Sequence, residues 1–296
     1  MTDTIADARY PRQLFDIRRL GRQIVQRQLW FIAFIALDVL ILYAIFTDPI
    51  LVETWNFIVP GISVTIQITL WSFFFATIVG LLTALARISK NALLYNLSTF
   101  YVELFRGLPL LVIILIFSFV ITPALIDVIA SIPALDDFLQ QLAGIAPDRI
   151  ATTALRSRDV EETARITFAF ALTYGAFMSE VFRAGIESIG RGQMEAARSL
   201  GMSYVQAMRY IILPQALRNV LPAMANNFVL LLKDTSLASA IAVPEISQLT
   251  RQYSSNRFRY PQGLLVLSFL YANLTIVMSM GVYWLEARLQ ADKQES

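Results

Sequence analysis

The 296-residue sequence contains neither cysteine nor histidine, and only 16% of its residues are charged. Without cysteine there is no thiol nucleophile and no thiolate ligand, and without histidine there is no imidazole for acid–base catalysis or metal binding. The net charge of +2 offers no uniformly basic surface for nucleic acid. A glycine-rich phosphate loop followed by lysine and serine or threonine is also missing. These absences exclude thiol and imidazole chemistry and predict no ATPase site in this chain.

Apolar residues dominate instead: 56% of the residues are hydrophobic and the mean hydropathy is +0.59. This composition indicates an integral membrane protein, and runs of about 20 apolar residues predict an all-α fold with about six transmembrane helices. The first run has no small-residue cleavage site and is expected to remain as an anchor. The predicted spans are residues 29–46, 61–86, a third that follows the bend at 106–109 and reaches 120 before Pro123, 166–186, 217–234 and 262–285.

The distribution of lysine and arginine predicts the orientation of these spans. The proposed cytoplasmic segments hold 15 of these residues and the proposed external segments hold 6, which favours cytoplasmic termini. The external segments are the loops 47–60, 121–162 and 243–260. Residues 91–104 carry a helical apolar stripe and are expected to lie along the cytoplasmic interface. Asp38, inside the first span, needs a partner or water. Either it forms a structural pair or is partly protonated, or it contacts a partner subunit.

A polar segment, residues 193–216, interrupts the apolar sequence. Gly201 is expected to end a first helix, because glycine readily takes the left-handed conformation that follows a last helical turn. Ser203 and Gln206 have the spacing of a capping box, which predicts a second helix that Pro214 interrupts. The segment is therefore predicted to form a short helix-turn-helix.

The first of these helices has features of a docking surface. Ala196 and Ala197 are expected to leave a flat face that another protein can approach closely, and Glu195 can make a charged hydrogen bond there. The alternative is a solvated helix at the membrane interface, whose substitution would have little effect.

These residues carry a resemblance to a known family. Glu195-Ala196-Ala197, then Gly201, then the run from Ile211 to Pro214 resemble the EAA motif of ATP-binding-cassette (ABC) importer permeases. Flanking stretches are similar to the polar amino-acid permeases of the histidine and glutamine type: residues 101–111, 174–176, 180–186, 213–216 and 232–237. Leu108 departs from the pattern, since the family usually has threonine there.

The resemblance implies a domain organisation. It covers roughly residues 60–120 and 165–290, so a five-helix importer-permease core is expected at 61–290. A cytoplasmic basic tail at 1–28 and an extra helix with its external loop at 29–60 would precede this core, and a C-terminal tail at 291–296 would follow it. Within the core, 121–162 is a periplasmic insertion, which either touches a binding protein or is merely tolerated. Residues 188–215 are the cytoplasmic coupling segment.

The resemblance also implies a mechanism and partners. The chain is expected to be a non-enzymatic subunit in the bacterial inner membrane that imports a polar or charged amino acid by alternating access. Its partners would be a separate ABC ATPase, a second permease subunit, identical or paralogous, and a periplasmic or extracellular amino-acid-binding protein. No cofactor is expected on this chain, since ATP and magnesium would bind the ATPase. The residues expected to couple to that ATPase are Glu195, Ala196, Ala197, Arg198, Gly201, Leu213 and Pro214.

Charged and hydroxyl residues inside the apolar runs are candidates for the substrate pathway. Lys233 and Asp234 interrupt one span, and intramembrane charges usually line a cavity; they are expected either to meet a zwitterion or to neutralise each other. Thr235 and Ser236 can line a path or allow close helix packing. Glu180 is a further candidate for the pathway. Glu103 and Arg106, three residues apart, are expected to form a local ion pair.

Two other function classes remain to be weighed. A secondary, ion-coupled transporter would often show inverted repeats, which are not evident here. An intramembrane serine protease would require Lys233 as its base.

Overall fold

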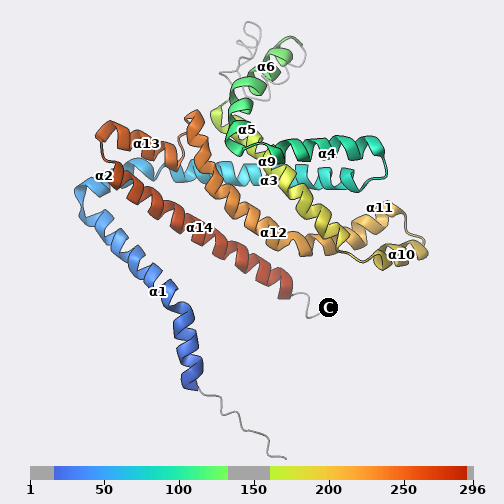
Figure 1. Ribbon diagram of the computed structural model, residues 1–296, viewed down its shortest axis with the longest axis horizontal. Helices are drawn as coiled ribbons and strands as arrows, with labels where there is room; N and C mark the ends of the chain where they lie inside the picture. The colour runs from blue at the N-terminus through green and yellow to red at the C-terminus, as the bar shows by residue number, and fades with distance from the viewer. Residues whose placement is uncertain (1–16, 133–160, 292–296) are drawn as a thin grey trace, which may run out of the picture. The chain divides into compact units, whose positions relative to one another are not determined.

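The computed structural model describes residues 17–132 and 161–291, and each element in these ranges is helical (Figure 1). The predicted all-α class is therefore confirmed. The chain divides into an N-terminal unit that ends at Val52 and a second unit that begins at Glu53. The predicted insertion at 121–162 falls largely outside the described residues.

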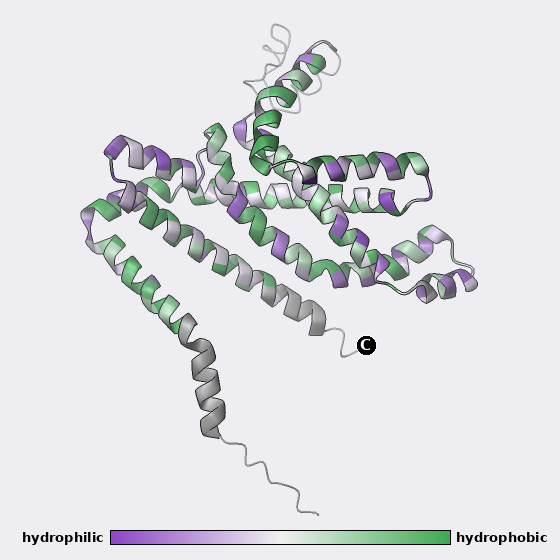
Figure 2. Cartoon of the chain, viewed as in Figure 1, coloured by the Kyte–Doolittle hydropathy of each residue, from purple (hydrophilic) through white to green (hydrophobic). Residues whose placement is uncertain are grey.

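Apolar helices of membrane-spanning length occur within the described residues. Three stretches are long and apolar enough to cross a bilayer, namely 49–88, 110–129 and 260–282, and 31–47 is a shorter apolar helix. Helices α9 (Glu162–Glu187) and α12 (Leu213–Asp234) have 26 and 22 residues but carry charged side chains. Figure 2 shows green, hydrophobic residues along α5 and purple, hydrophilic residues concentrated in α10 and α13. The count of six spans stays a prediction.

The N-terminal unit contains helix α1 (Ile17–Thr47). It begins well before residue 29, so the predicted tail at 1–28 is already helical from Ile17 onwards. Arginine, glutamine and leucine in this stretch are good helix formers. Leu40 and Tyr43 are exposed, as expected of a helix that faces lipid. Helix α2 (Pro49–Ile58) follows, so the predicted loop at 47–60 is largely helical.

The centre of the second unit is the contact between α3 (Gly61–Ile88) and α9, which cross in Figure 1. Small residues line this contact, because a Cβ atom added at Gly80 would lie 2.5 Å from the Cβ of Met178. A Cβ atom added at Gly175 would likewise lie 2.8 Å from a methyl group of Val79 in α3. Lipid tails are as apolar as the side chains of a membrane helix, so helices in a membrane associate through close packing. Small residues allow their backbones to approach closely.

Substituting Gly80 by alanine is expected to destabilise the fold by about 1–3 kcal/mol, because overpacking forces the two helices apart. The atom that a new methyl group would meet is a Cβ, which cannot move independently of its backbone. Gly281→Ala is the control, since a Cβ at Gly281 in helix α14 would meet nothing within 4 Å. Thermal unfolding of the detergent-purified protein measures the difference, and equal midpoints for both variants would contradict this account of the packing.

Helix α4 (Ala92–Gly107) begins at Asn91, whose side chain accepts hydrogen bonds from the backbone N–H groups of Leu93 and Leu94. It packs against both α3 and α9. The Tyr101 hydroxyl donates to the carbonyl oxygen of Leu172 in α9. Residues 91–104 are therefore attached to the helical core, and their position along the cytoplasmic interface stays a prediction.

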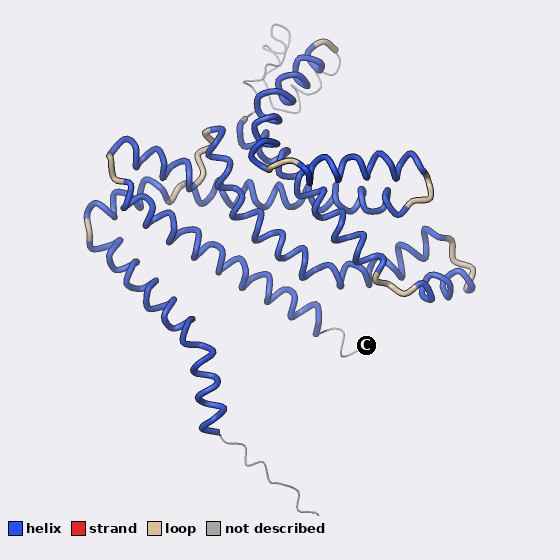
Figure 3. Tube along the Cα trace, viewed as in Figure 1, coloured by secondary structure: helices blue, strands red, loops and turns tan. Residues whose placement is uncertain are grey.

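Two π-helical turns precede prolines in the same register. Helix α5 (Leu110–Ile116) continues through η1 (Phe117–Ile121) into α6 (Thr122–Ala130), past Pro123. Likewise η3 (Met208–Ile212) leads into α12 past Pro214, and Figure 3 shows helical tube at both places. A wider turn accommodates a residue that lacks an N–H group and crowds the preceding turn. The predictions that Pro123 ends a span and that Pro214 interrupts a helix are therefore wrong.

The last part of the second unit contains η4 (Thr235–Ile241), α13 (Ile246–Arg257) and α14 (Tyr260–Ala291). The predicted loop at 243–260 is thus mostly the helix α13. Arg257 and Arg259 both pair with Glu53, at N···O distances of 3.0 and 2.8 Å. Both arginines lie in a segment predicted to be external, where they count against the excess of lysine and arginine on the cytoplasmic side. Glu53 gives both of them a counter-ion within the chain.

Candidate functional site

The predicted coupling segment forms two short helices where α9 and α12 meet (Figure 1). They are α10 (Arg191–Ser199) and α11 (Tyr204–Ala207). Helix α11 runs on through η3 (Met208–Ile212) into α12, so the coupling segment is continuous with a long helix of the core.

The turn between α10 and α11 has the predicted chemistry. Gly201 has φ +84°, and its N–H donates to the carbonyl of Arg198 while the N–H of Met202 donates to that of Ala197. This pair of bonds is a Schellman motif, which satisfies the last carbonyls of α10. Ser203 and Gln206 make a complete capping box. The helix stop and the second helix start are both confirmed.

The exposed surface of α10 differs in one residue from the prediction. Glu195, Ala196 and Arg198 are exposed, whereas Ala197 is buried. Ala197 points about 100° away from Ala196 around the helix axis and packs inward, so the two alanines do not form one flat exposed face. Only Ala196 is available for a close approach, and Ala197 instead lets α10 lie close to the rest of the chain.

Two apolar side chains on this segment were not predicted as functional. Leu200, just before the turn, is 82% exposed, and Val205, in α11, is 71% exposed. Exposed apolar side chains that adjoin charged ones mark interaction surfaces when they cluster. A sequence pattern cannot find them, since an apolar residue in a membrane protein gives no sign of whether lipid, core or partner will cover it.

The segment is attached to α9 through an apolar cluster. Ile186, Met208, Ile212 and Ala216 are buried together, and Leu213 packs against them. The side-chain amide of Asn219 also donates to the hydroxyl of Ser188, at 3.1 Å. Leu213 therefore has a packing role, while Pro214 is exposed in the first turn of α12.

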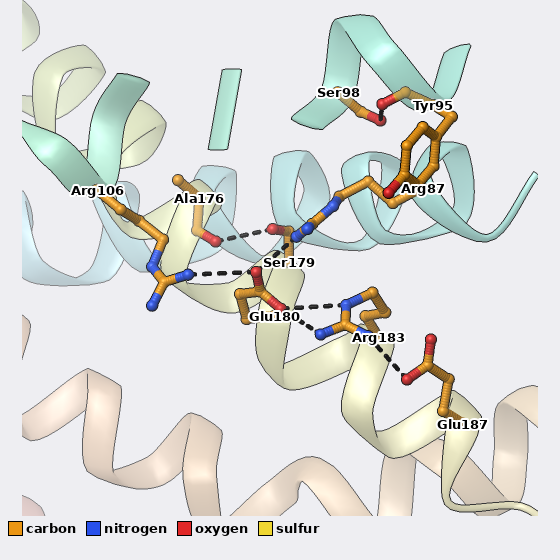
Figure 4. A network of polar contacts seen from close by, with 9 residues as sticks. All are labelled: Arg87, Tyr95, Ser98, Arg106, Ala176, Ser179, Glu180, Arg183 and Glu187. Atoms are coloured by element: carbon orange, nitrogen blue, oxygen red, sulfur yellow. Dashed lines mark hydrogen bonds and ion pairs between the residues drawn. The ribbon is translucent and has the colours of Figure 1, made fainter. Parts of the chain in front are cut away.

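Glu180, predicted for the substrate pathway, lies in an ion-pair network (Figure 4). Its Oε1 accepts from Arg87 at 2.6 Å and from Arg106 at 3.2 Å, and its Oε2 accepts from Nε and Nη2 of Arg183 at 3.1 and 2.8 Å. Arg183 also donates to Glu187, at 2.8 Å. Arg106 thus pairs with Glu180 in another helix, which corrects the predicted local pair with Glu103.

The two adjacent charges at the end of α12 have different surroundings. Asp234 accepts a hydrogen bond of 2.6 Å from the hydroxyl of Tyr174 in α9, and Thr235 is buried. Lys233 is exposed and lines an open cavity of about 570 Å³ together with Ser236. The other lining residues come from α13 and α14: Ser247, Leu267, Ser268, Tyr271, Ala272, Thr275 and Ile276.

A buried carboxylate that sequence reasoning missed lies behind this cavity. Glu245 is fully buried and caps α13 by accepting from the N–H groups of Ser247 and Gln248, and it also accepts from the Tyr271 hydroxyl. Burial raises the pKa of the Glu245 carboxyl, although these donors act in the opposite direction. Its capping spacing is visible in the sequence, but its burial is not.

Comparison with known proteins shows the family. The family described as "Binding-protein-dependent transport system inner membrane component" matches residues 76–291. The chain belongs to this family, whose members are permease subunits of ABC importers. It is therefore a multi-pass inner-membrane protein and not an enzyme. The similarity gives no support to the ion-coupled alternative.

Individual relatives have similar lengths. The probable amino-acid ABC transporter permease YckA of Bacillus subtilis is 34% identical over 77% of this chain and 86% of its own length. The L-cystine permease TcyB of the same species is 32% identical over 79% and 87%. A solved structure, an amino acid ABC transporter with histidines, is 27% identical, with a TM-score of 0.62 over 80% of this chain and 96% of that one. A methionine ABC transporter, MetNI, shares the fold with a TM-score of 0.56 at 19% identity.

Proposed function

We propose that this permease imports an amino acid. The relatives that match most of its length are amino-acid permeases by name, and the solved relative is an amino acid transporter. A polar or charged substrate suits the polar residues of the cavity beside Lys233. This chain would supply one half of the pathway, with a second permease subunit supplying the other half and a binding protein delivering the amino acid from outside.

The energy would come from a separate ATPase that docks on the coupling segment. The observation that supports this proposal is the exposure of Glu195, Ala196, Arg198, Leu200 and Val205 on α10, α11 and the turn that joins them. A segment that exposes both charged and large apolar side chains has the composition of a protein interface. ATP and magnesium would bind that partner, and this chain would hold no cofactor.

The substrate would pass the cavity that Lys233 and Ser236 line. A lysine ammonium at a cavity wall can bind the carboxylate that every amino acid carries. Asp234 is held by Tyr174 on the α9 side and Thr235 is buried, so these two residues would shape the path rather than contact the substrate. The lysine and arginine bias supports cytoplasmic termini, with α10 and α11 on the same side as the ATPase.

Uptake by the complete complex in proteoliposomes tests the transport of amino acids. We expect a panel of unlabelled amino acids to identify a competitor, and we expect Lys233→Gln to raise the concentration for half-maximal uptake roughly tenfold or more, the cost of losing a charged hydrogen bond. Lys90→Gln, which removes an exposed cation outside the cavity, is the control. Uptake that no amino acid competes for would refute the substrate class, and wild-type affinity in Lys233→Gln would refute the path.

A further inference from the structure

The Glu180 network joins three helices at one carboxylate. Arg87 is in the last turn of α3, Arg106 is in the last turn of α4, and Glu180 and Arg183 are on α9. Arg183 then bridges to Glu187, the last residue of α9. A continuous series of ion pairs therefore runs from α3 and α4 to the end of α9, and α10 begins at Arg191.

The hydrogen-bonding capacity of Glu180 is used up in this arrangement. An ionised carboxylate offers about four lone-pair positions, and Glu180 accepts four bonds, two at each oxygen. None is left for the ammonium group of an amino acid. Glu180 is also absent from the lining of the cavity beside Lys233. The substrate-pathway role predicted for Glu180 therefore has no support from its contacts.

The network depends on Glu180 for its charge balance. It contains three guanidinium groups and two carboxylates, so one positive charge is already in excess. The side chain of Arg87 is only 10% exposed, and its Nε is buried without a hydrogen-bond partner among the described residues. Buried charges are stable only when they are paired. Glu180 therefore holds Arg87, and with it the end of α3, against α9.

We propose that Glu180 is a positioning residue that makes α3, α4 and the base of the coupling segment move as one body. The inference rests on the proposed docking of an ATPase at α10, and it adds a second route for that motion. The first route runs from α11 through η3 into α12. The second route runs from α10 through Glu187 and Arg183 to Glu180, and from there to α3 and α4. The first route ends in α12 and does not include these two helices.

Arg106 is the residue that best tests this role, because its side chain is 43% exposed and its pair with Glu180 is the longest in the network. Arg106→Gln removes the link to α4 while Arg87 and Arg183 keep their counter-ion. We expect the complex to assemble and hydrolyse ATP but to import roughly tenfold less substrate per ATP, a typical coupling effect. Amide hydrogen exchange in residues 183–199 should become faster. Arg106→Lys should restore much of both properties, and Lys90→Gln should change neither.

Two results with Arg106→Gln would overturn the proposal. One is unchanged import per ATP, and the other is a loss of import with unchanged hydrogen exchange at residues 183–199. If Arg106→Gln does not accumulate, Glu187→Gln replaces it, since Glu187 is 55% exposed and ends the series; wild-type coupling in that variant would also overturn the proposal. If exchange becomes faster in Arg106→Gln but the ATPase does not contact α10, the proposed docking site is wrong, whereas the positioning role of the network stands.

Discussion

Replacing Glu195 by lysine is expected to release the ATPase from the complex during purification. Glu195 is exposed on α10 beside Ala196, in the surface that we propose to enter the partner. A reversed charge there places like charges in contact, which costs several kcal/mol. Because about 1.4 kcal/mol corresponds to a tenfold change in affinity, the complex should bind at least about a hundredfold more weakly. Co-purification of the ATPase with the tagged permease measures the loss.

The control lies outside the coupling segment. Gln252 is exposed on α13. Gln252→Lys adds the same positive charge away from the proposed docking face and should keep the ATPase bound. Leu200→Asp is a second test of the same face, because an apolar anchor at an interface tolerates a charge poorly. Full retention of the ATPase by both Glu195→Lys and Leu200→Asp would show that α10 is a solvated helix.

The elements of this fold that could be predicted from the sequence are those that local chemistry determines. Gly201 ends α10, and Ser203 with Gln206 begins α11, because positive φ and capping bonds depend only on neighbouring residues. Apolar runs likewise revealed α3 and α14. The prolines were misread because a π-helical turn can absorb Pro123 and Pro214, and nothing in the local pattern distinguishes such a turn from a helix end.

The residues of the candidate site were harder to assign, since their roles depend on which helices meet. The charges of Glu180, Arg183 and Lys233 are conspicuous in apolar runs, but only the packing of α3 and α4 on α9 brings Arg87 and Arg106 to Glu180. Likewise the alternation of exposed and buried positions on α10 requires its contact with η3. Ala197 was therefore assigned to the docking surface although it faces inward.

Replacing Gly201 by valine is expected to leave the ATPase bound but to abolish most of its stimulation by substrate. The φ angle of +84° at Gly201 is unfavourable for a β-branched residue by about 1–3 kcal/mol. A Cβ atom there would meet nothing within 4 Å, so the effect comes from the backbone alone. The turn should relax and re-aim α11, while the face of α10 that carries Glu195 stays intact.

Two matched variants separate backbone strain from a simple change of side chain at this turn. Gly190, at the other end of α10, has φ −55° and also has nothing within 4 Å of an added Cβ; Gly190→Val should therefore keep stimulated hydrolysis. Gly201→Asn should retain part of it, because asparagine tolerates the left-handed region better than valine does. The rates of ATP hydrolysis with and without substrate and binding protein, in preparations with equal ATPase content, measure the coupling. Stimulation at the wild-type level in Gly201→Val would show that the direction in which α11 leaves the turn does not matter for transmission into α12.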